Sequence, residues 1–305
     1  MIEVTVIIPA KNEEACIGNC IESINRNEYP SERYEVIVVD NGSSDSTVSI
    51  AKSHGAEVAI KPGVNVSALR NLGASMAKGS VLAFIDADCT VASDWLAEAE
   101  KYFKRDDVVC FGSTPGIPDN PTWVQRTWAL ARLKKEEEVE TAWLESMNMF
   151  VKKEFLQKIG GFNERLETCE DVDISYRLSR YGRIISDTNI RAVHHGEARD
   201  IREFFVKEKW RGKGNYPGIF AHALRIDEMP SVILPFYFAL VPALAFVFYL
   251  IGSSGLLISG LLILWQMPVI MIAYIKTVKR FELATLFRMV ILYNVYYLAR
   301  LSAIL

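Results

Sequence analysis

The sequence predicts an α/β domain built on a mostly parallel sheet, followed by a helical membrane anchor. Two observations carry this prediction. Short apolar segments alternate with amphipathic ones up to about residue 115, and no charged side chain occurs between Met229 and Ile275. Alternating strands and helices produce a parallel sheet that is covered on both faces. A long uncharged stretch is typical of segments that cross a bilayer.

The N-terminal part of the chain alternates strands and helices in a regular order. Short apolar runs predict strands at 4–8, 35–39, 58–60, 81–85 and 108–111. Between them, apolar residues recur every three or four positions and predict helices at 13–25, 45–53, 66–77 and 93–103. Ligands of such sheets bind beyond the carboxyl ends of the strands. The residues that directly follow the strands are therefore the first candidates for a functional site.

Acidic and turn-forming residues follow three of these strands. They are Pro9 to Glu13 after the first strand, Asp40 to Ser43 after the second and Asp86-Ala87-Asp88 after the fourth. The chain has no GxGxxG after the first strand and no GxxxxGKS, so a standard dinucleotide fold and a P-loop are both unsupported. A divalent cation on carboxylates could hold a phosphate instead. The Asp86-Ala87-Asp88 motif alone is weak evidence, because Asp171-Val172-Asp173 repeats the pattern.

Composition argues against several classes of protein and site. The 305 residues carry 34 basic and 37 acidic side chains, so bulk charge gives no reason to expect a nucleic-acid partner. The five cysteines form no paired CxxC spacing, which favours a reduced compartment and argues against a zinc site. Residues 1–4 lack the features of a signal peptide, so we expect residues 1–228 to form a cytoplasmic domain.

Residues 229–305 read as a membrane domain. We expect a transmembrane hairpin at about 232–251 and 256–275, turning at Gly252-Ser253-Ser254-Gly255. Basic residues flank the outer ends of the hairpin and none lies in the turn, so the positive-inside rule places both ends in the cytoplasm. This predicts a multi-pass protein of the plasma (inner) membrane with its N-terminal domain on the cytoplasmic face.

Two further segments suggest contact with lipid. In the apolar segment at about 283–305, Arg288 and Arg300 leave only a short uncharged stretch, and a mid-bilayer arginine costs about 2.5 to 3.5 kcal/mol. This segment either spans the membrane with both arginines snorkelling or lies in the interface. Residues 199–213 mix basic and aromatic side chains, which predicts an amphipathic segment on an anionic membrane surface. A solvated helix face is the alternative for this second segment.

Six motifs, taken in order, resemble those of the family 2 inverting glycosyltransferases with a GT-A fold, the Rossmann-like fold of nucleotide-diphospho-sugar transferases. The resemblance covers roughly residues 3–215. The motifs are Val6–Glu13, Val38–Asp45, Arg70–Gly73, Phe84–Asp88, Gly160–Glu164 and Glu170–Asp173.

The resemblance implies a site for a nucleotide-diphosphate sugar and a divalent metal, Mg²⁺ or Mn²⁺. Asp88 would ligate the metal, with His195 as a candidate third ligand and a structural histidine as the alternative. Tandem histidines point to opposite sides of an extended chain, so at most one would face the metal. The other donor-side residues would be Pro9, Ala10 and Glu13 in the nucleoside pocket, Asp40 on the base, Arg70 near the pyrophosphate and Asp86 at the ribose or the metal's water shell.

By the same resemblance Asp171, next to Glu170, would be the general base that deprotonates the acceptor hydroxyl. The residues support this assignment, because Asp171 lies three positions before Ile174 at the head of a predicted buried stripe of Ile174, Leu178 and Tyr181. Asp173 can pair with Arg177 four residues later. The alternative is a set of helix-start carboxylates that stabilise the helix dipole.

The predicted function is metal-dependent, inverting transfer of one sugar from a UDP-sugar or another sugar nucleotide. The acceptor would be a hydroxyl of a lipid-linked or cell-surface glycan precursor. Residues 206–210 depart from the Gln-x-x-Arg-Trp motif of processive family members, which favours single addition. The alternatives are transfer to polyprenyl phosphate, a non-catalytic membrane nucleotide-binding scaffold and a nucleotidyltransferase.

Overall fold

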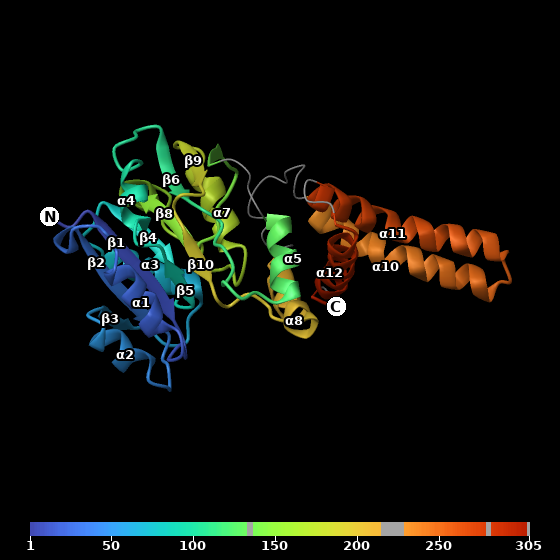
Figure 1. The fold of residues 1–305 in the computed structure, drawn as a ribbon, viewed down its shortest axis with the longest axis horizontal. Helices are drawn as coiled ribbons and strands as arrows, with labels where there is room; N and C mark the ends of the chain where they lie inside the picture. The colour runs from blue at the N-terminus through green and yellow to red at the C-terminus, as the bar shows by residue number, and fades with distance from the viewer. Residues whose placement is uncertain (133–136, 215–228, 279–281, 304–305) are drawn as a thin grey trace. The chain divides into compact units, whose positions relative to one another are not determined.

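The chain forms two compact units in the computed structural model, which describes residues 1–132, 137–214, 229–278 and 282–303 (Figure 1). The first unit comprises residues 1–118 and 134–197, and the second comprises residues 119–133 and 198–305. This division differs from the boundary at residue 228 expected from the sequence. It differs because segments 119–133 and 198–214 contribute helices that pack with the C-terminal helices.

The large sheet of the first unit is mixed, with its parallel part at the N-terminal half. Its order is β3-β2-β1-β4-β8-β6-β9-β7. The first four strands in this order run parallel, whereas β8 is antiparallel to both of its neighbours and β7 is an antiparallel edge strand. The strands are β1 (Val4–Ala10), β2 (Tyr34–Asp40), β3 (Glu57–Ile60), β4 (Val81–Ile85), β6 (Val108–Gly112), β7 (Glu138–Glu140), β8 (Asn148–Lys152) and β9 (Arg183–Asp187).

Helices cover both faces of this sheet, as the alternating pattern predicts. Val6 and Ile8 of β1 pack in the core under α1, α2 and α4, while Ile7 packs in the core under α3, α6 and α7. Successive side chains of a strand point to opposite faces, so a strand buried on both sides is apolar throughout. The helices are α1 (Ile17–Asn25), η1 (Ser31–Arg33), α2 (Thr47–Ser53), α3 (Val66–Met76), α4 (Trp95–Glu100), α6 (Lys153–Lys158) and α7 (Glu170–Leu178).

A second, two-stranded sheet joins the segment after β4 to the end of the first unit. Its strands β5 (Cys89–Val91) and β10 (Ala192–His194) are antiparallel. His194 lies directly opposite Cys89 in this register. The pairing brings a histidine from late in the sequence next to the aspartates that follow β4.

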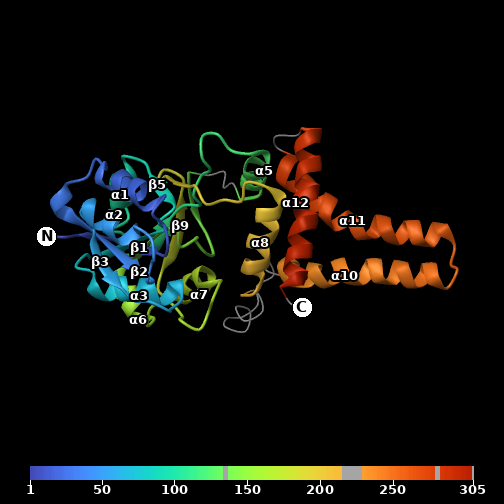
Figure 2. The ribbon, with the colours of Figure 1, turned by 90° about the horizontal axis from the view of Figure 1, so that it is seen from below.

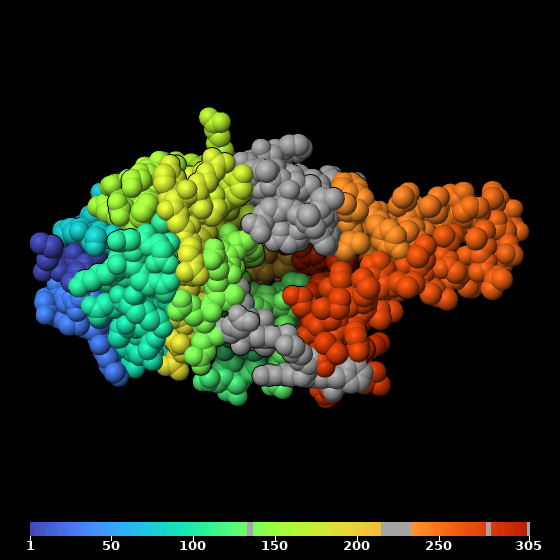
Figure 3. All heavy atoms as spheres, turned by 90° about the horizontal axis from the view of Figure 1, so that it is seen from above, coloured from blue at the N-terminus to red at the C-terminus, as the bar shows by residue number. Residues whose placement is uncertain are grey.

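The second unit contains a helical hairpin. Its helices α10 (Met229–Leu250) and α11 (Gly255–Thr277) agree with the two predicted spans. Residues 233–250 and 255–277 have a mean hydropathy of 2.2 and are long enough to cross a membrane. The outer surface of the hairpin (orange in Figure 3) carries exposed apolar side chains that include Leu240, Phe246, Tyr249, Leu256, Ile263 and Met271. The hairpin is therefore a possible membrane anchor.

Three shorter or less apolar helices complete the second unit: α5 (Trp123–Arg132), α8 (Ile201–Gly212) and α12 (Leu283–Ser302). In Figure 2, α12 runs across the end of the hairpin and alongside α8. Phe204 of α8 is buried against Trp128, at a ring-centroid distance of 4.8 Å. Val206 and Trp210 stay exposed, so the apolar side chains of the predicted amphipathic segment divide between a protein contact and a free face.

A buried ion pair links α8 to α12. Glu208 is 1% exposed, and its carboxylate accepts hydrogen bonds from Arg300 at 2.8 Å and Arg211 at 2.6 Å. Arg300 thus has an acidic partner on a neighbouring helix. Among the described helices, only α10 and α11 are both long and apolar enough to be candidate membrane spans.

Replacing Glu208 with alanine is expected to destabilise the second unit by about 3 to 5 kcal/mol, because Arg300 would lose the carboxylate that compensates its burial. The unfolding temperature of the detergent-solubilised protein measures this loss. The exposed Lys209→Ala serves as the control on the same helix and should leave that temperature unchanged. Equal unfolding temperatures for the two variants would show that the ion pair does not hold α8 to α12.

Candidate functional site

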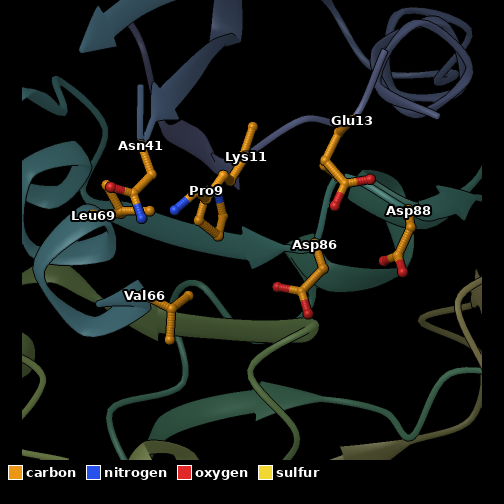
Figure 4. Close-up of a pocket in the computed structure, with 10 residues that line it drawn as sticks. Pro9, Lys11, Glu13, Asn41, Val66, Leu69, Asp86 and Asp88 are labelled. Atoms are coloured by element: carbon orange, nitrogen blue, oxygen red, sulfur yellow. The ribbon is translucent and has the colours of Figure 1, made fainter. Parts of the chain in front are cut away.

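A pocket of about 260 Å³ lies where the parallel strands of the first unit end. Pro9 and Ala10 close β1, Asn41 follows β2, and Asp86 to Asp88 follow β4. Val66 and Leu69 of α3 supply an apolar wall. Figure 4 shows the carboxylates of Glu13, Asp86 and Asp88 at one end of the pocket and Pro9, Lys11, Asn41 and Leu69 at the other. The pocket thus has an acidic end and a less acidic end.

Asp40, the predicted contact to the base, holds a loop next to this pocket. It is 1% exposed, and its carboxylate accepts hydrogen bonds from Gly42 N at 2.9 Å, Ser43 N at 2.8 Å and Ser43 Oγ. The neighbouring Asn41 lines the pocket instead. Sequence reasoning did not single out Asn41, although its place directly after a strand was the available signal.

The acidic end of the pocket gathers carboxylates that repel one another. Burial, together with the nearby charges of Asp88 and Asp86, raises the pKa of Glu13 to about 7. Negative charges held this close favour a bound cation, since a divalent ion would relieve their repulsion.

The imidazole of His194, and not that of the predicted ligand His195, lies beside the Asp88 carboxylate. The Nε2 atom of His194 is 3.1 Å from Asp88 Oδ2, and its Nδ1 atom is 3.1 Å from Glu197 Oε1. Although burial lowers it, these two carboxylates raise the pKa of His194 to about 9. His195 Nε2 instead lies 2.9 Å from Thr90 Oγ1. Side chains alternate along an extended strand, and the pairing of β10 with β5 turns His194 toward Asp88.

The residues around Asp88 fit a divalent metal. One ligand atom each from Asp88, Cys89 and His194 lie within 4.8 Å of one another. At Gly196, an added Cβ would lie 1.9 Å from Asp88 Oδ2 and 2.8 Å from His194 Nε2, so only glycine leaves this place open. Glu197 orients the histidine ring, as carboxylates commonly do for metal-binding histidines. Carboxylate oxygen suits Mg²⁺ or Mn²⁺, whereas burial raises the pKa of the Cys89 thiol and makes Cys89 the weakest ligand of the three.

Arg70 connects this acidic group to a second one at the start of α7. Its side chain is 2% exposed, with Nη2 2.9 Å from Asp86 Oδ1 and Nη1 2.8 Å from Glu170 Oε1. Predicted to lie near the pyrophosphate, Arg70 therefore sits between two carboxylates in the structure. Its positive charge compensates both, and breaking such a buried pair is costly.

Asp171 heads α7 beside Glu170. Burial and the negative charges of Glu170 and Glu145 raise the pKa of Asp171 to about 8. Asp173 pairs with Arg177 at 2.5 Å, as the four-residue spacing predicts. Ile174 and Leu178 are buried, but the third member of the predicted stripe, Tyr181, is 49% exposed because α7 ends at Leu178.

Residues 5–160 match the family model described as glycosyl transferase family 2. The chain belongs to this family. Glycosyltransferase AglE of Haloferax volcanii is 29% identical to this chain over 220 residues. The match covers 69% of this chain and 72% of AglE. The beta-monoglucosyldiacylglycerol synthase of Trichormus variabilis is 28% identical over 191 residues, or 57% of this chain and 41% of the synthase.

Among solved structures, the glycosyltransferase resembles mannosyltransferase PcManGT from Pyrobaculum calidifontis, which was solved in complex with GDP-Man and Mn²⁺. The TM-score is 0.67 at 19% identity, and the match covers 96% of this chain and 87% of PcManGT. This likeness concerns the fold, and it agrees with the GT-A architecture that the sequence predicts for the first unit.

The acidic side chains of the glycosyltransferase form two groups that can carry out different chemistry. Asp86 and Asp88, with His194, can hold a cation at the pocket. Glu170 and Asp171 lie on the other side of the Arg70 guanidinium, and the raised pKa of Asp171 suits an acid–base role near neutral pH.

Proposed function

We propose that this glycosyltransferase moves one sugar from a nucleotide-diphosphate sugar to an acceptor hydroxyl, with inversion at the anomeric carbon. The observation that carries this proposal is the pair of acidic groups on either side of Arg70. One group lines the pocket and is suited to a cation, and the other contains an acid suited to proton transfer. In an inverting displacement the acceptor attacks opposite the leaving group, so a base on one side of the sugar and a cation on the other can act in the same step.

On the donor side, Pro9, Ala10 and Glu13 would form walls of the nucleoside pocket. Asp40 would act on the base through the loop it holds, and Asp86 would face the ribose or the water shell of the ion. Asp88 and His194 would hold Mg²⁺ or Mn²⁺. When bound, such an ion neutralises the charge that develops on a departing diphosphate. The family resemblance favours a uridine nucleotide over a guanosine or thymidine nucleotide.

On the acceptor side, Asp171 would take the proton of the attacking hydroxyl. Glu170 binds Arg70, whose positive charge partly offsets the effect of burial and of the neighbouring carboxylates on the pKa of Asp171. An acceptor that is already an anion would need no base. Asp171 therefore favours a hydroxyl acceptor over polyprenyl phosphate.

The second unit supports an acceptor at a membrane, such as a lipid-linked or cell-surface precursor in polysaccharide biosynthesis. The α10–α11 hairpin would span the plasma (inner) membrane with the catalytic domain on its cytoplasmic face. Helix α12 crosses the end of the hairpin, and Arg300 pairs with Glu208 of α8, which favours the interfacial alternative for residues 283–305. The exposed face of α8, with Val206 and Trp210, would contact lipid.

Incubation of the detergent-solubilised protein with a panel of sugar nucleotides and Mn²⁺ tests this function. We expect release of a nucleoside diphosphate, loss of release with a chelator and an inverted product anomer by NMR. An acid-labile product would instead identify polyprenyl phosphate as the acceptor. In a parallel incubation with a nucleoside triphosphate and a sugar 1-phosphate, release of pyrophosphate would identify a nucleotidyltransferase. Binding of sugar nucleotide without turnover would identify a scaffold.

A further inference from the structure

We infer that two asparagines, Asn65 at the N-cap of α3 and Asn71 within α3, are positioning residues that hold the loop before α7 and thereby place the general base relative to the donor pocket. This inference rests on the proposed function. It concerns residues 160–166, called here the base-side loop, which precede Glu170 and Asp171 in the chain. Neither asparagine is among the predicted site residues.

Helix α3 is in contact with both sides of the reaction. Val66 and Leu69 line the pocket proposed for the donor. Arg70, on the same helix, binds Glu170 next to the proposed base. A helix is stiff over so short a distance, so groups fixed to α3 keep a constant separation. Side chains that tie the base-side loop to α3 therefore set where the base lies.

Asn71 holds the backbone of the base-side loop in both directions. Its Oδ1 accepts a hydrogen bond from Phe162 N at 2.8 Å, and its Nδ2 donates to Phe162 O at 3.0 Å and to Glu164 Oε1 at 2.9 Å. An amide side chain can accept through its oxygen while it donates two hydrogen bonds through its nitrogen. Aspartate, which has nearly the same shape, would keep the acceptor and lose both donated bonds.

Asn65 holds the far end of the same loop while it caps α3. Its Oδ1 accepts from Ala68 N at 3.1 Å, which satisfies an N–H at the start of the helix. Its Nδ2 donates to Glu164 O at 2.6 Å and to Leu166 O at 3.2 Å. The Oδ1 atom of Asn65 caps the helix and its Nδ2 atom holds the loop. An aspartate could therefore still cap the helix but could not donate to the loop.

The conformation of the base-side loop depends on this close contact. Gly160 and Gly161 have φ values of +77° and +81°, which side-chain-bearing residues rarely adopt. A Cβ at Gly161 would also lie 2.6 Å from Asn71 Oδ1. Glycine therefore lets the amide reach the backbone here, and the amide in turn holds a turn that the chain would not otherwise retain.

Helix α7 also forms hydrogen bonds to the base-side loop. Arg177 donates from Nη1 to Ile159 O at 3.0 Å and to Gly161 O at 2.7 Å. The Phe162 ring packs edge-on against Phe84 at 5.0 Å and lies 5.5 Å from the Arg70 guanidinium. The base-side loop is thus clamped between the helix that lines the donor pocket and the helix that carries Asp171.

Loosening this clamp would misplace the base without changing the donor pocket. We therefore expect Asn71→Asp and Asn65→Asp to lower kcat for sugar transfer by about 10- to 100-fold, the range that a misplacement of about 1 Å can cost. The affinity for the nucleoside diphosphate with Mn²⁺ should stay within about 2-fold. Water is small and needs less orientation, so slow donor hydrolysis should fall less than transfer.

The experiment compares both variants with Ser75→Ala, whose hydroxyl bonds only within α3 among the described contacts. Transfer kcat, nucleotide affinity by calorimetry and donor hydrolysis without acceptor are measured on the full chain in detergent. A transfer-specific loss supports the positioning role. Unchanged transfer, or parallel losses in all three measurements, overturns it. Hydrogen exchange at Leu166, whose N–H donates to Asn163 O within the base-side loop at 3.2 Å, supplies a readout besides activity and should be faster in both variants.

This experiment distinguishes failure of the proposed function from failure of the positioning role. If the wild-type chain transfers sugar from no nucleotide, the proposed function is refuted. If the wild type is active and both asparagine variants are equally active, only the positioning role is refuted. If Asn71→Asp does not fold, Asn65→Asp still tests the inference, because it preserves the helix cap.

Discussion

Replacing Asp171 with asparagine is expected to lower the rate of sugar transfer by about 10³- to 10⁴-fold while leaving nucleotide binding intact. Loss of a general base costs about 10² to 10⁴ in rate, and we expect the upper part of this range because a neutral hydroxyl is a weak nucleophile. Asparagine has the shape of aspartate and accepts no proton. The measurements are kcat for transfer and the affinity for the nucleoside diphosphate with Mn²⁺.

The pH dependence of the wild-type kcat/KM tests the same role of Asp171. Burial and the carboxylates of Glu170 and Glu145 raise the pKa of Asp171 to about 8, so the free enzyme holds this acid protonated below that pH. Only the ionised form accepts a proton. The value of kcat/KM should therefore rise with pH through about 8 and be flat at a low level in Asp171→Asn. Glu167→Gln, at an exposed acid before α7, should retain the wild-type profile.

Replacing Asp88 with asparagine is expected to abolish measurable turnover and to weaken Mn²⁺ binding by at least about 10-fold. The substitution removes one of the two residues best placed to hold the ion, and loss of even an outer-shell partner of a metal ligand typically costs about 10- to 100-fold in affinity. Calorimetric titration with Mn²⁺ in the presence of nucleoside diphosphate measures the effect independently of turnover.

The tandem histidines provide the matched control for this site. His194→Ala should weaken Mn²⁺ binding, whereas His195→Ala should not, because His195 lies against Thr90. Gly196→Ala should also weaken binding, since its methyl group would occupy the space beside Asp88 Oδ2. A larger loss of affinity in His195→Ala than in His194→Ala would contradict the assignment of the ion to His194.

Features that depend on local pattern could be predicted from the sequence. The strands of the parallel half, β1 to β4, are short apolar runs, and the acids that follow them lie at the pocket because parallel strands end at one edge. The α10–α11 hairpin could be predicted for the same reason, since an uncharged stretch is itself the signal.

Features that depend on pairing between distant segments could not be predicted. The sequence does not show that β8 inserts antiparallel between β4 and β6, because no local pattern encodes which strands become neighbours. The choice of His194 over His195 follows from the register of β10 with β5. In the sequence, Glu208 is one of several charged residues of a predicted amphipathic segment. Its burial depends on Arg300, 92 positions away in the chain.

A crystal structure with a non-transferable sugar nucleotide and Mn²⁺ tests the central claim most directly. The account predicts an ion at about 2.0 to 2.3 Å from oxygen of Asp88 and nitrogen of His194, with the diphosphate in the pocket next to it. Asp171 should lie on the face of the anomeric carbon that is opposite the diphosphate. An ion bound away from Asp88, or an anomeric carbon turned away from Asp171, would contradict the account.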